Sequence, residues 1–258
     1  MRTKFVQHSG LVSGTNALYD YSINQGQLDA KLYKPRWTTA GGVFVWKLPN
    51  FHFDPSDAQN LLDRAKKYSG LVLDLRRNPG GLVEDEKQLL GYFLNHDVTV
   101  MTRQGRRHAG PARASTNRDH YAGNLVVVVV DSGSASAAEI FARTVQLEHL
   151  GTVIGDTTPG AVMEAEHFPM QFGDMNIGSA TFCGASITVD DLIMPDGHSL
   201  EKVGDTPDVI ALPTAADLAA GRDTVLAQAV KLAGGAGDTA ALAQAFPMIC
   251  PPYNSGAN

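Results

Sequence analysis

Residues 125–130, Leu-Val-Val-Val-Val-Val, most strongly limit the folds open to this chain. Six branched apolar residues are too few for a typical helix, and their β-branched side chains favour a strand. An unbroken apolar run is typical of a strand covered on both faces of a sheet. The run stops at Asp131–Ser134, and Ala135–Leu147 then carries apolar residues at helical spacing. A buried strand, a small-residue turn and an amphipathic helix are therefore predicted in succession.

A similar succession of strand, turn and helix is predicted earlier in the chain. Leu71–Leu75 is a nearly continuous apolar run, followed by the turn Asn78–Gly81 and a helix predicted over Glu84–Leu94. Val43–Leu48 predicts a further strand, and Asp54-Pro55-Ser56 is typical of a helix start. Alternating strands and helices place the chain in the α/β class. Other strands are predicted over Val98–Thr102, Thr152–Ile154 and Gly178–Val189, and helices over Leu212–Gly221 and Thr224–Leu232.

The predicted organisation is one large domain with two appended ends. Residues 1–40 are polar and are interpreted as a peripheral segment or the remnant of an upstream domain. Residues 41–235 form the predicted catalytic core. Residues 236–258 turn to Gly, Ala and Pro and are expected to be a loosely held tail.

Composition and charge exclude several classes of partner. The net charge of -6 disfavours nucleic acid, and the chain lacks eighteen consecutive apolar residues, so no membrane span is predicted. No metal or other cofactor is expected, because no Cys/His cluster has ligand spacing and no glycine-rich phosphate loop occurs. The cysteines, Cys183 and Cys250, are taken as free thiols. Without a signal peptide the default location is the cytoplasm, or outside it if the chain is a processed fragment.

A cluster of basic residues lies between Arg103 and Arg118, interleaved with Gly, Pro, Ser and Asn. This composition predicts an exposed loop. One interpretation is an ordinary solvated loop, and the other is a flap that attracts a substrate carboxylate to an active site.

Chemistry is expected where the two buried strands end, at Asn78–Gly81 and Ser132–Ser136, because ligands bind at the carboxyl ends of central strands. A serine at a helix start lies beside unpaired N–H groups that can hold an oxyanion. Serine is also a preferred N-cap, and a glycine pair can be only a tight turn. Three serines, at 132, 134 and 136, exceed what capping needs.

Two segments carry a family resemblance. Gly70–Gly81 and Ser134–Ile140 resemble the two signature segments of the carboxyl-terminal processing, or tail-specific, serine peptidases. Gly151–Gly155, Asp196-Gly197 and Glu201–Asp208 follow in that family's order. The resemblance covers residues 41–235 and implies the spiral of β-β-α units shared with the Clp peptidase and the crotonases.

The resemblance implies a serine peptidase that acts on peptides or proteins. It maps the nucleophile to Ser136 and the oxyanion hole to Gly80, Gly81 and Ala137. An oligomer is possible within this family.

The catalytic base departs from the family pattern. The family's lysine falls at Gly160–Val162, and no lysine occurs between Lys87 and Lys202. The chain is therefore more similar to the tricorn-like branch, which uses Ser, His and Glu, and its acid maps to Glu201. His198 is the predicted histidine, since it is nearest in sequence to that acid, with His167 as the alternative.

Neither a PDZ domain nor the helical domain that carries the tricorn-like histidine is recognisable in the first 40 residues. Three functions therefore remain open. The first is a processing-type peptidase, the second is an esterase-like hydrolase, and the third is a peptide-binding homologue that has lost catalysis.

Overall fold

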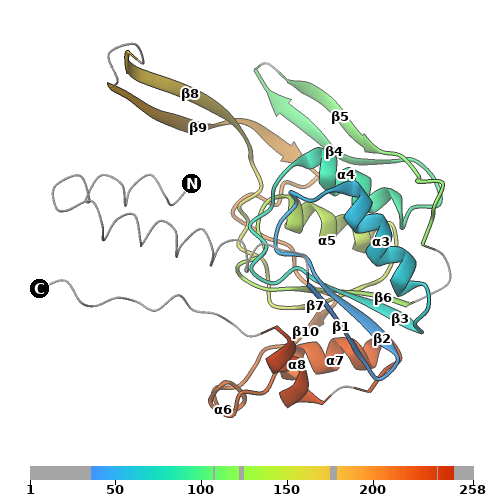
Figure 1. Cartoon of the computed structure of the whole chain (residues 1–258). Helices are drawn as coiled ribbons and strands as arrows, with labels where there is room; N and C mark the ends of the chain where they lie inside the picture. The colour runs from blue at the N-terminus through green and yellow to red at the C-terminus, as the bar shows by residue number, and fades with distance from the viewer. Residues whose placement is uncertain (1–35, 107, 122–124, 175–178, 237, 247–258) are drawn as a thin grey trace, which may run out of the picture.

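A computed structural model describes residues 36–246, except 107, 122–124, 175–178 and 237. Its central element is a six-stranded sheet with the order β1-β2-β3-β6-β7-β10 (Figure 1). All neighbours are parallel except β1, which pairs antiparallel with β2. The strands are β1 (Arg36–Ala40), β2 (Val43–Lys47), β3 (Gly70–Asp74), β6 (Leu125–Val130), β7 (Thr152–Gly155) and β10 (Val209–Ile210).

Helices cover both faces of this sheet. Figure 1 shows α3 (Pro55–Ala65), α4 (Val83–Gly91) and α5 (Ala137–Leu147) on one face, and α7 (Thr224–Leu232) and α8 (Thr239–Ala245) on the other. The short helix α6 (Ala215–Ala219) precedes α7. No described helix is long and apolar enough to cross a membrane.

The apolar run of β6 explains the two layers. Val128 packs into the core cluster shared with α3, α4 and α5, whereas Val127 and Val129 pack with α7 and α8. Successive residues of a strand point to opposite faces, so an unbroken apolar run supplies both cores. The prediction of a strand buried on both sides is confirmed, and with it the α/β class.

The second sheet is antiparallel, with the order β5-β4-β9-β8. It contains β4 (Val98–Gly105), β5 (Ala109–Ala114), β8 (Glu164–Asp174) and β9 (Ser179–Ile193). The β8–β9 hairpin extends well beyond the rest of the described molecule (Figure 1).

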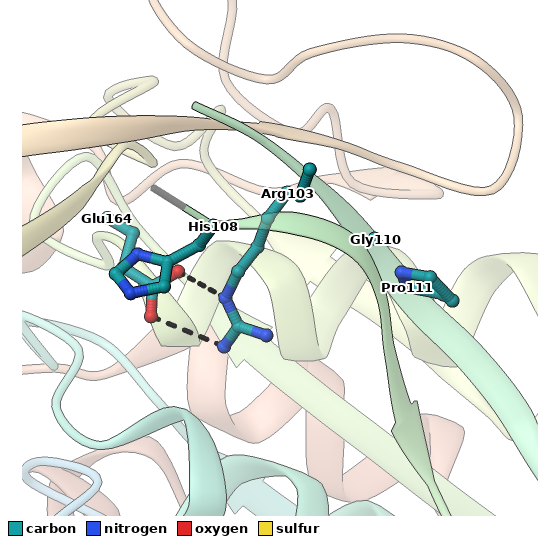
Figure 2. A pocket seen from close by; sticks show the side chains of 6 residues that line it. Arg103, His108, Gly110, Pro111 and Glu164 are labelled. Carbon is teal, nitrogen blue, oxygen red and sulfur yellow. Dashed lines mark hydrogen bonds and ion pairs between the residues drawn. The ribbon is translucent and has the colours of Figure 1, made fainter. Parts of the chain in front are cut away.

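The expectation of a loop between Arg103 and Arg118 is wrong as far as Ala114, because β4 ends at Gly105 and pairs antiparallel with β5, which ends at Ala114. Figure 2 shows Arg103 binding the carboxylate of Glu164 on β8. His108 contacts Asp190 of β9 at 2.9 Å. An ion pair from Arg103 and a hydrogen-bond contact from His108 therefore tie these side chains to β8 and β9.

The domain boundaries also differ from those expected. Strand β1 pairs along its whole length with β2, so the core begins before residue 41. At the other end, Leu242 and Phe246 are buried against the α7 side of the sheet, so α8 is part of the fold and not a loose tail. Residues 1–35 and 247–258, with Cys250, and the side chain of Cys183 lie outside the described part.

One buried acid makes stability depend on pH. Glu86 in α4 is fully buried, and neither carboxylate oxygen has a partner within the described residues. Burial raises the pKa of this carboxyl well above its usual range, helped by Glu84 and opposed by Lys87. The folded state therefore keeps a proton that the unfolded chain loses above about pH 4.3.

Because the pKa of Glu86 is higher in the folded state than in the unfolded chain, the free energy of unfolding should fall as the pH rises between these two pKa values. The expected slope is up to about 1.4 kcal/mol per pH unit. Glu86→Gln should match the wild type near pH 4 and be more stable at pH 8 in urea titrations. Glu84→Gln, on an exposed side chain of the same helix, is the control and should show no such divergence. Parallel pH profiles for Glu86→Gln and the wild type would contradict the assignment.

Candidate active site

The turns that follow β3 and β6 meet at one edge of the six-stranded sheet, because these strands are parallel neighbours. The N–H of Ala135 donates to the carbonyl of Asn78 at 2.8 Å. A Cβ atom added to Gly80, whose φ is 93°, would lie 2.7 Å from Cβ of Ser136. The structure therefore brings the predicted serine against the predicted glycine pair, and only glycine fits at this contact.

Ser136 is the N-cap of α5 and has φ 57° and ψ −121°. Residues with a β-carbon rarely adopt positive φ, and such outliers concentrate at functional sites. A serine on a sharp strand-to-helix turn projects its hydroxyl away from the sheet. Ser136 and Glu139 form a capping box in which the Ser136 side chain faces the N–H of Glu139; the Ser136 hydroxyl donates to no group within the described residues, and the side chain is half-buried. It is therefore open to a substrate.

The two other serines of the turn have different surroundings. Ser134 is fully buried, and its hydroxyl donates to the carbonyl of Leu75 at 2.9 Å and accepts from the N–H of Asp131 at 2.9 Å. Ser132 is exposed on the turn. Ser134 thus holds the turn to the end of β3, and its hydroxyl already donates and accepts hydrogen bonds within the fold.

The predicted oxyanion donors fall into two groups. The N–H of Gly80 donates to Oδ1 of Asn78 at 2.9 Å, so it is already paired. The N–H groups of Gly81 and Ala137 donate to no group in the described part of the chain. Gly81 lies in a parallel bridge with Phe51 that uses only the flanking backbone groups. Gly81 and Ala137 are therefore the two free donors beside Ser136.

Glu139 links the serine to the loop that follows β7. Its carboxylate is fully buried and accepts from the N–H of Ser136 at 3.0 Å and the N–H of Ala161 at 2.9 Å through the same oxygen, Oε2. The other oxygen accepts from Thr158 Oγ1 at 2.6 Å and from the N–H of Gly160 at 2.8 Å. Four donors on one carboxylate fix this loop beside the serine.

The role of Glu139 was not predicted, although the sequence contains a signal for it. A serine N-cap followed three residues later by glutamate has the spacing of a capping box, in which the acid binds the N-cap N–H. The added contacts to Thr158 and Gly160 depend on residues about 20 positions away, and no local pattern indicates them.

The predicted acid and histidine are not brought together. Oε2 of Glu201 accepts from the N–H of Val162 at 2.9 Å. His198 is 81% exposed and its ring faces Asp196, with Nδ1 3.5 Å from Oδ1. No contact joins His198 to Glu201 or to Ser136 within the described residues. The alternative, His167, lies in β8, and its side chain is outside the described part.

A second buried acid lies beside the same loop. Asp205 exchanges backbone and hydroxyl hydrogen bonds with Thr158. Burial raises the pKa of the Asp205 carboxyl to about 7, opposed by Arg143 at 3.8 Å and reinforced by Asp208. The charge of Asp205 is therefore expected to change near neutral pH. Thr158 links this residue to Glu139, because its hydroxyl accepts from the N–H of Asp205 and donates to the Glu139 carboxylate.

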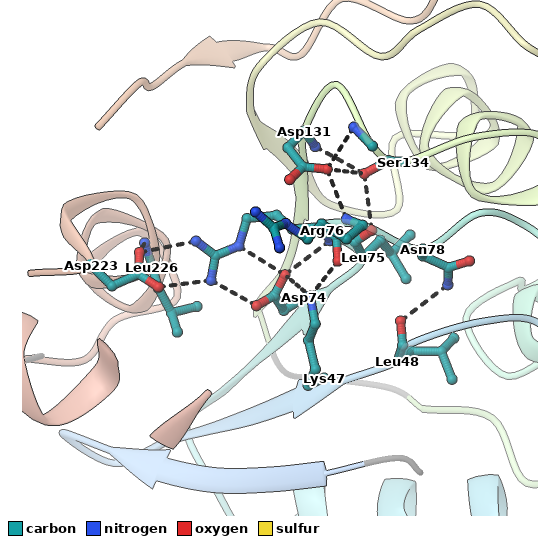
Figure 3. A network of polar contacts seen from close by, with 12 residues as sticks. Lys47, Leu48, Asp74, Leu75, Arg76, Asn78, Asp131, Ser134, Asp223 and Leu226 are labelled. Atoms are coloured by element: carbon teal, nitrogen blue, oxygen red, sulfur yellow. Dashed lines mark hydrogen bonds and ion pairs between the residues drawn. The ribbon is translucent and has the colours of Figure 1, made fainter. Parts of the chain in front are cut away.

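The glycine turn is anchored by a charged network at the end of β3 (Figure 3). Asp74 is fully buried and binds Lys47 at 3.0 Å and Arg76 at 2.8 Å. Arg76 also binds Asp223, the N-cap of α7, at 2.8 Å. Although burial alone raises the pKa of Asp74, the charges of Arg76 and Lys47 outweigh it and hold that pKa well below its usual range.

Comparison with known proteins agrees with this geometry. Residues 45–211 match the sequence signature of peptidase family S41. The chain belongs to that family, and the resemblance predicted from its motifs is confirmed.

Curated relatives share about a third of their residues with this chain over the matched region. The chain is 31% identical over 143 residues to a carboxyl-terminal-processing protease of Synechocystis sp., which is 55% of this chain and 30% of that protein. It is 30% identical over 144 residues to the carboxy-terminal processing protease CtpB of Bacillus subtilis, covering 56% of this chain and 28% of that protein. The match therefore spans less than a third of either relative.

Solved structures share the fold at lower identity. A peptidase candidate from Parabacteroides merdae has a TM-score of 0.60 at 20% identity, over 80% of this chain and 68% of that one. The photosystem II D1 C-terminal processing protease has a TM-score of 0.53 at 22% identity, over 69% of this chain and 48% of that one. These likenesses confirm the fold predicted from the resemblance.

Proposed function

We propose that this chain hydrolyses peptide bonds through an acyl-enzyme on Ser136. The observation that carries the proposal is the hydroxyl of Ser136, whose proton has no acceptor in the described residues, beside the unpaired N–H groups of Gly81 and Ala137. Membership of peptidase family S41 supports a peptide or protein as the substrate class.

In the proposed reaction Oγ of Ser136 gives its proton to a base and bonds to the carbonyl carbon of the scissile peptide. The carbonyl π electrons move to oxygen, and the N–H groups of Gly81 and Ala137 donate to the resulting oxyanion. When the carbonyl re-forms, the C–N bond breaks and the leaving amine takes the proton from the base. Water then attacks the acyl-enzyme in the same way, which releases a carboxylic acid and returns a proton to Oγ.

Ester hydrolysis is the second candidate, because the predicted histidine, His198, faces Asp196 and not Glu201. An ester has a better leaving group than an amide and needs less help from a general acid. A site without a strong acid–base partner therefore favours esters over peptides.

A substrate panel separates these candidates. A fluorogenic peptide and a short-chain nitrophenyl ester should both be hydrolysed by the wild type, and both activities should fall at least about a thousandfold in Ser136→Ala. Ser132→Ala, in an exposed serine of the same turn, is the control and should retain them. Ester hydrolysis alone would favour the second candidate, and hydrolysis of neither substrate would contradict the proposed function.

A further inference from the structure

A chain of hydrogen bonds connects Asp205 to the backbone of the nucleophile. The N–H of Asp205 donates to the hydroxyl of Thr158 at 2.6 Å, and this hydroxyl donates to Oε1 of Glu139 at 2.6 Å. Oε2 of the same carboxylate accepts from the N–H of Ser136 at 3.0 Å. Asp205, Thr158 and Glu139 are all buried. A displacement of Asp205 therefore acts on the group that holds Ser136 in its positive-φ turn.

The two segments that meet at these contacts approach each other very closely. A Cβ added to Gly204, whose φ is 79°, would lie 2.1 Å from the carbonyl oxygen of Thr158. A Cβ added to Gly160, whose φ is 69°, would lie 2.6 Å from the backbone nitrogen of Val203. The N–H of Thr158 also donates to the carbonyl of Asp205 at 3.0 Å. Because closely packed groups transmit strain, the turn that carries Asp205 cannot move without the loop after β7.

The carboxyl group of Asp205 lacks the partners that a buried charge needs. It is 1% exposed, and its Oδ2 has no hydrogen-bond partner within the described residues. Its Oδ1 is 3.8 Å from the Arg143 guanidinium, which is too long for a hydrogen bond. Arg143 itself binds Asp196 and Gln146. Burial without a donor favours the neutral acid, and this is the cause of the raised pKa of Asp205, about 7.

Charged groups from three segments face the Asp205 carboxyl. Helix α5 contributes Arg143 and Glu139, the turn after β9 contributes Asp196, and the segment of Asp205 itself contributes Asp208. Arg143 favours the carboxylate form of Asp205, whereas the three acids oppose it. Ionisation of Asp205 therefore adds a negative charge to a group in which carboxylates already outnumber the guanidinium.

This added charge opposes the reaction at Ser136 in two ways. The ionised side chain is drawn toward Arg143, and the movement pulls the hydroxyl of Thr158 away from Glu139. The negative charge also disfavours the oxyanion, which forms at the start of the helix that carries Glu139. Both effects make the neutral form of Asp205 the more active one.

We propose that Asp205 is a positioning residue for the reaction at Ser136, which supports catalysis while its carboxyl is neutral and impairs it when ionised. The inference rests on the proposed hydrolysis. Asp205 acts through Thr158 and Glu139 and not on the reacting atoms. The consequence is a limb in the pH dependence of kcat/KM that descends above about pH 7, because this constant reports the titration of the free enzyme.

The first test compares Asp205→Asn with the wild type, since asparagine has nearly the same shape and stays neutral at every pH. The measured quantity is kcat/KM on the fluorogenic peptide between about pH 5.5 and 9. The ratio of the variant to the wild type cancels the titration of the base, which both proteins share. This ratio should be constant below about pH 6 and about tenfold higher at pH 8.

Asp63→Asn, which removes an exposed carboxylate, is the control, and its ratio to the wild type should stay constant with pH. A purely structural role of Asp205 would change the ratio for Asp205→Asn equally at every pH. The rise of the ratio above pH 7 therefore separates a positioning role from a loss of stability.

A second pair of variants tests the connection through Thr158. Thr158→Val keeps the size of the side chain but removes the hydroxyl, so it should lower kcat/KM at pH 6 by about tenfold and flatten the limb above pH 7. Thr158→Ser keeps the hydroxyl and should restore the limb. Circular dichroism checks that each variant folds, and the Thr158 pair decides the question if Asp205→Asn does not.

Three outcomes would overturn the inference. They are a ratio for Asp205→Asn that stays constant with pH, a ratio that falls above pH 7, and a limb of full size in Thr158→Val. In each case the wild type still hydrolyses the peptide and reacts with a fluorophosphonate probe, so the proposed function stands. A wild type that neither hydrolyses a substrate nor reacts with the probe would contradict the proposed function itself.

Discussion

Gly80→Ala is expected to lower kcat/KM on the fluorogenic peptide by about 100-fold or more, while the protein still folds. The added methyl group would lie 2.7 Å from Cβ of Ser136 and 2.9 Å from the carbonyl oxygen of Ala135. Contacts this short force the serine and the N–H of Ala137 away from the glycine turn. The oxyanion donors then no longer converge on one carbonyl oxygen.

Gly110→Ala is the matched control for this substitution. Gly110 also has a positive φ, 122°, but a methyl group there meets no atom within 4 Å. It therefore carries the same kind of backbone strain without the steric contact. Circular dichroism should show both variants folded. Equal activity in the two variants would mean that the approach of Gly80 to the serine has no part in the reaction.

Asp74→Ala is expected to lower the free energy of unfolding by about 3–5 kcal/mol in urea titrations at pH 7. The substitution leaves Lys47 and Arg76 without their shared buried partner, and both cations are largely buried themselves. Removing one member of a buried ion network is strongly destabilising, because the remaining charges stay desolvated without the opposite charge that compensated them. Figure 3 shows that Asp74 lies at the centre of the contacts.

The pH dependence of this variant follows from the lowered pKa of Asp74. A carboxyl whose folded pKa is depressed contributes stability above its unfolded pKa, near 3.9, and that contribution is lost as the pH falls further. The gap between the wild type and Asp74→Ala should therefore be full at pH 7 and shrink below about pH 4. Asp63→Ala, which removes an exposed pair with Lys66, should cost less than about 1 kcal/mol. A similar cost for both variants would contradict the network.

Local patterns sufficed to predict the core of the fold. The apolar runs of β3 and β6 need only their own residues to indicate strands buried on both faces. The start of α3 was equally readable, because Asp54 caps the N–H of Ser56 at 2.8 Å and proline follows at the first helical position. The contact between Ser136 and Gly80 follows once the two strands are parallel neighbours.

The second sheet depends on contacts between distant segments. Pro111 and Gly110 lie within β5, where such residues weaken a strand prediction, and the strand exists through its register with β4. Glu164 of β8 partners an arginine 61 positions earlier in the chain. Composition reveals neither pairing, so the basic, Gly- and Pro-containing segment predicts a loop where the structure has a hairpin.

The predicted histidine and acid are close in sequence but do not contact each other in the structure. His198 is three positions from Glu201, but the turn between them directs the imidazole toward Asp196 and the carboxylate toward the N–H of Val162.

Mass spectrometry of the protein after reaction with a fluorophosphonate probe tests the central claim most directly. A single adduct is predicted, on the peptide that contains Ser136, and Ser136→Ala should carry none while Ser132→Ala is labelled as the wild type. The physical reasons are that the hydroxyl of Ser136 donates to no group in the described residues, whereas the hydroxyl of Ser134 donates to the carbonyl of Leu75. An adduct on Ser132 or Ser134, or one that persists in Ser136→Ala, would contradict the account.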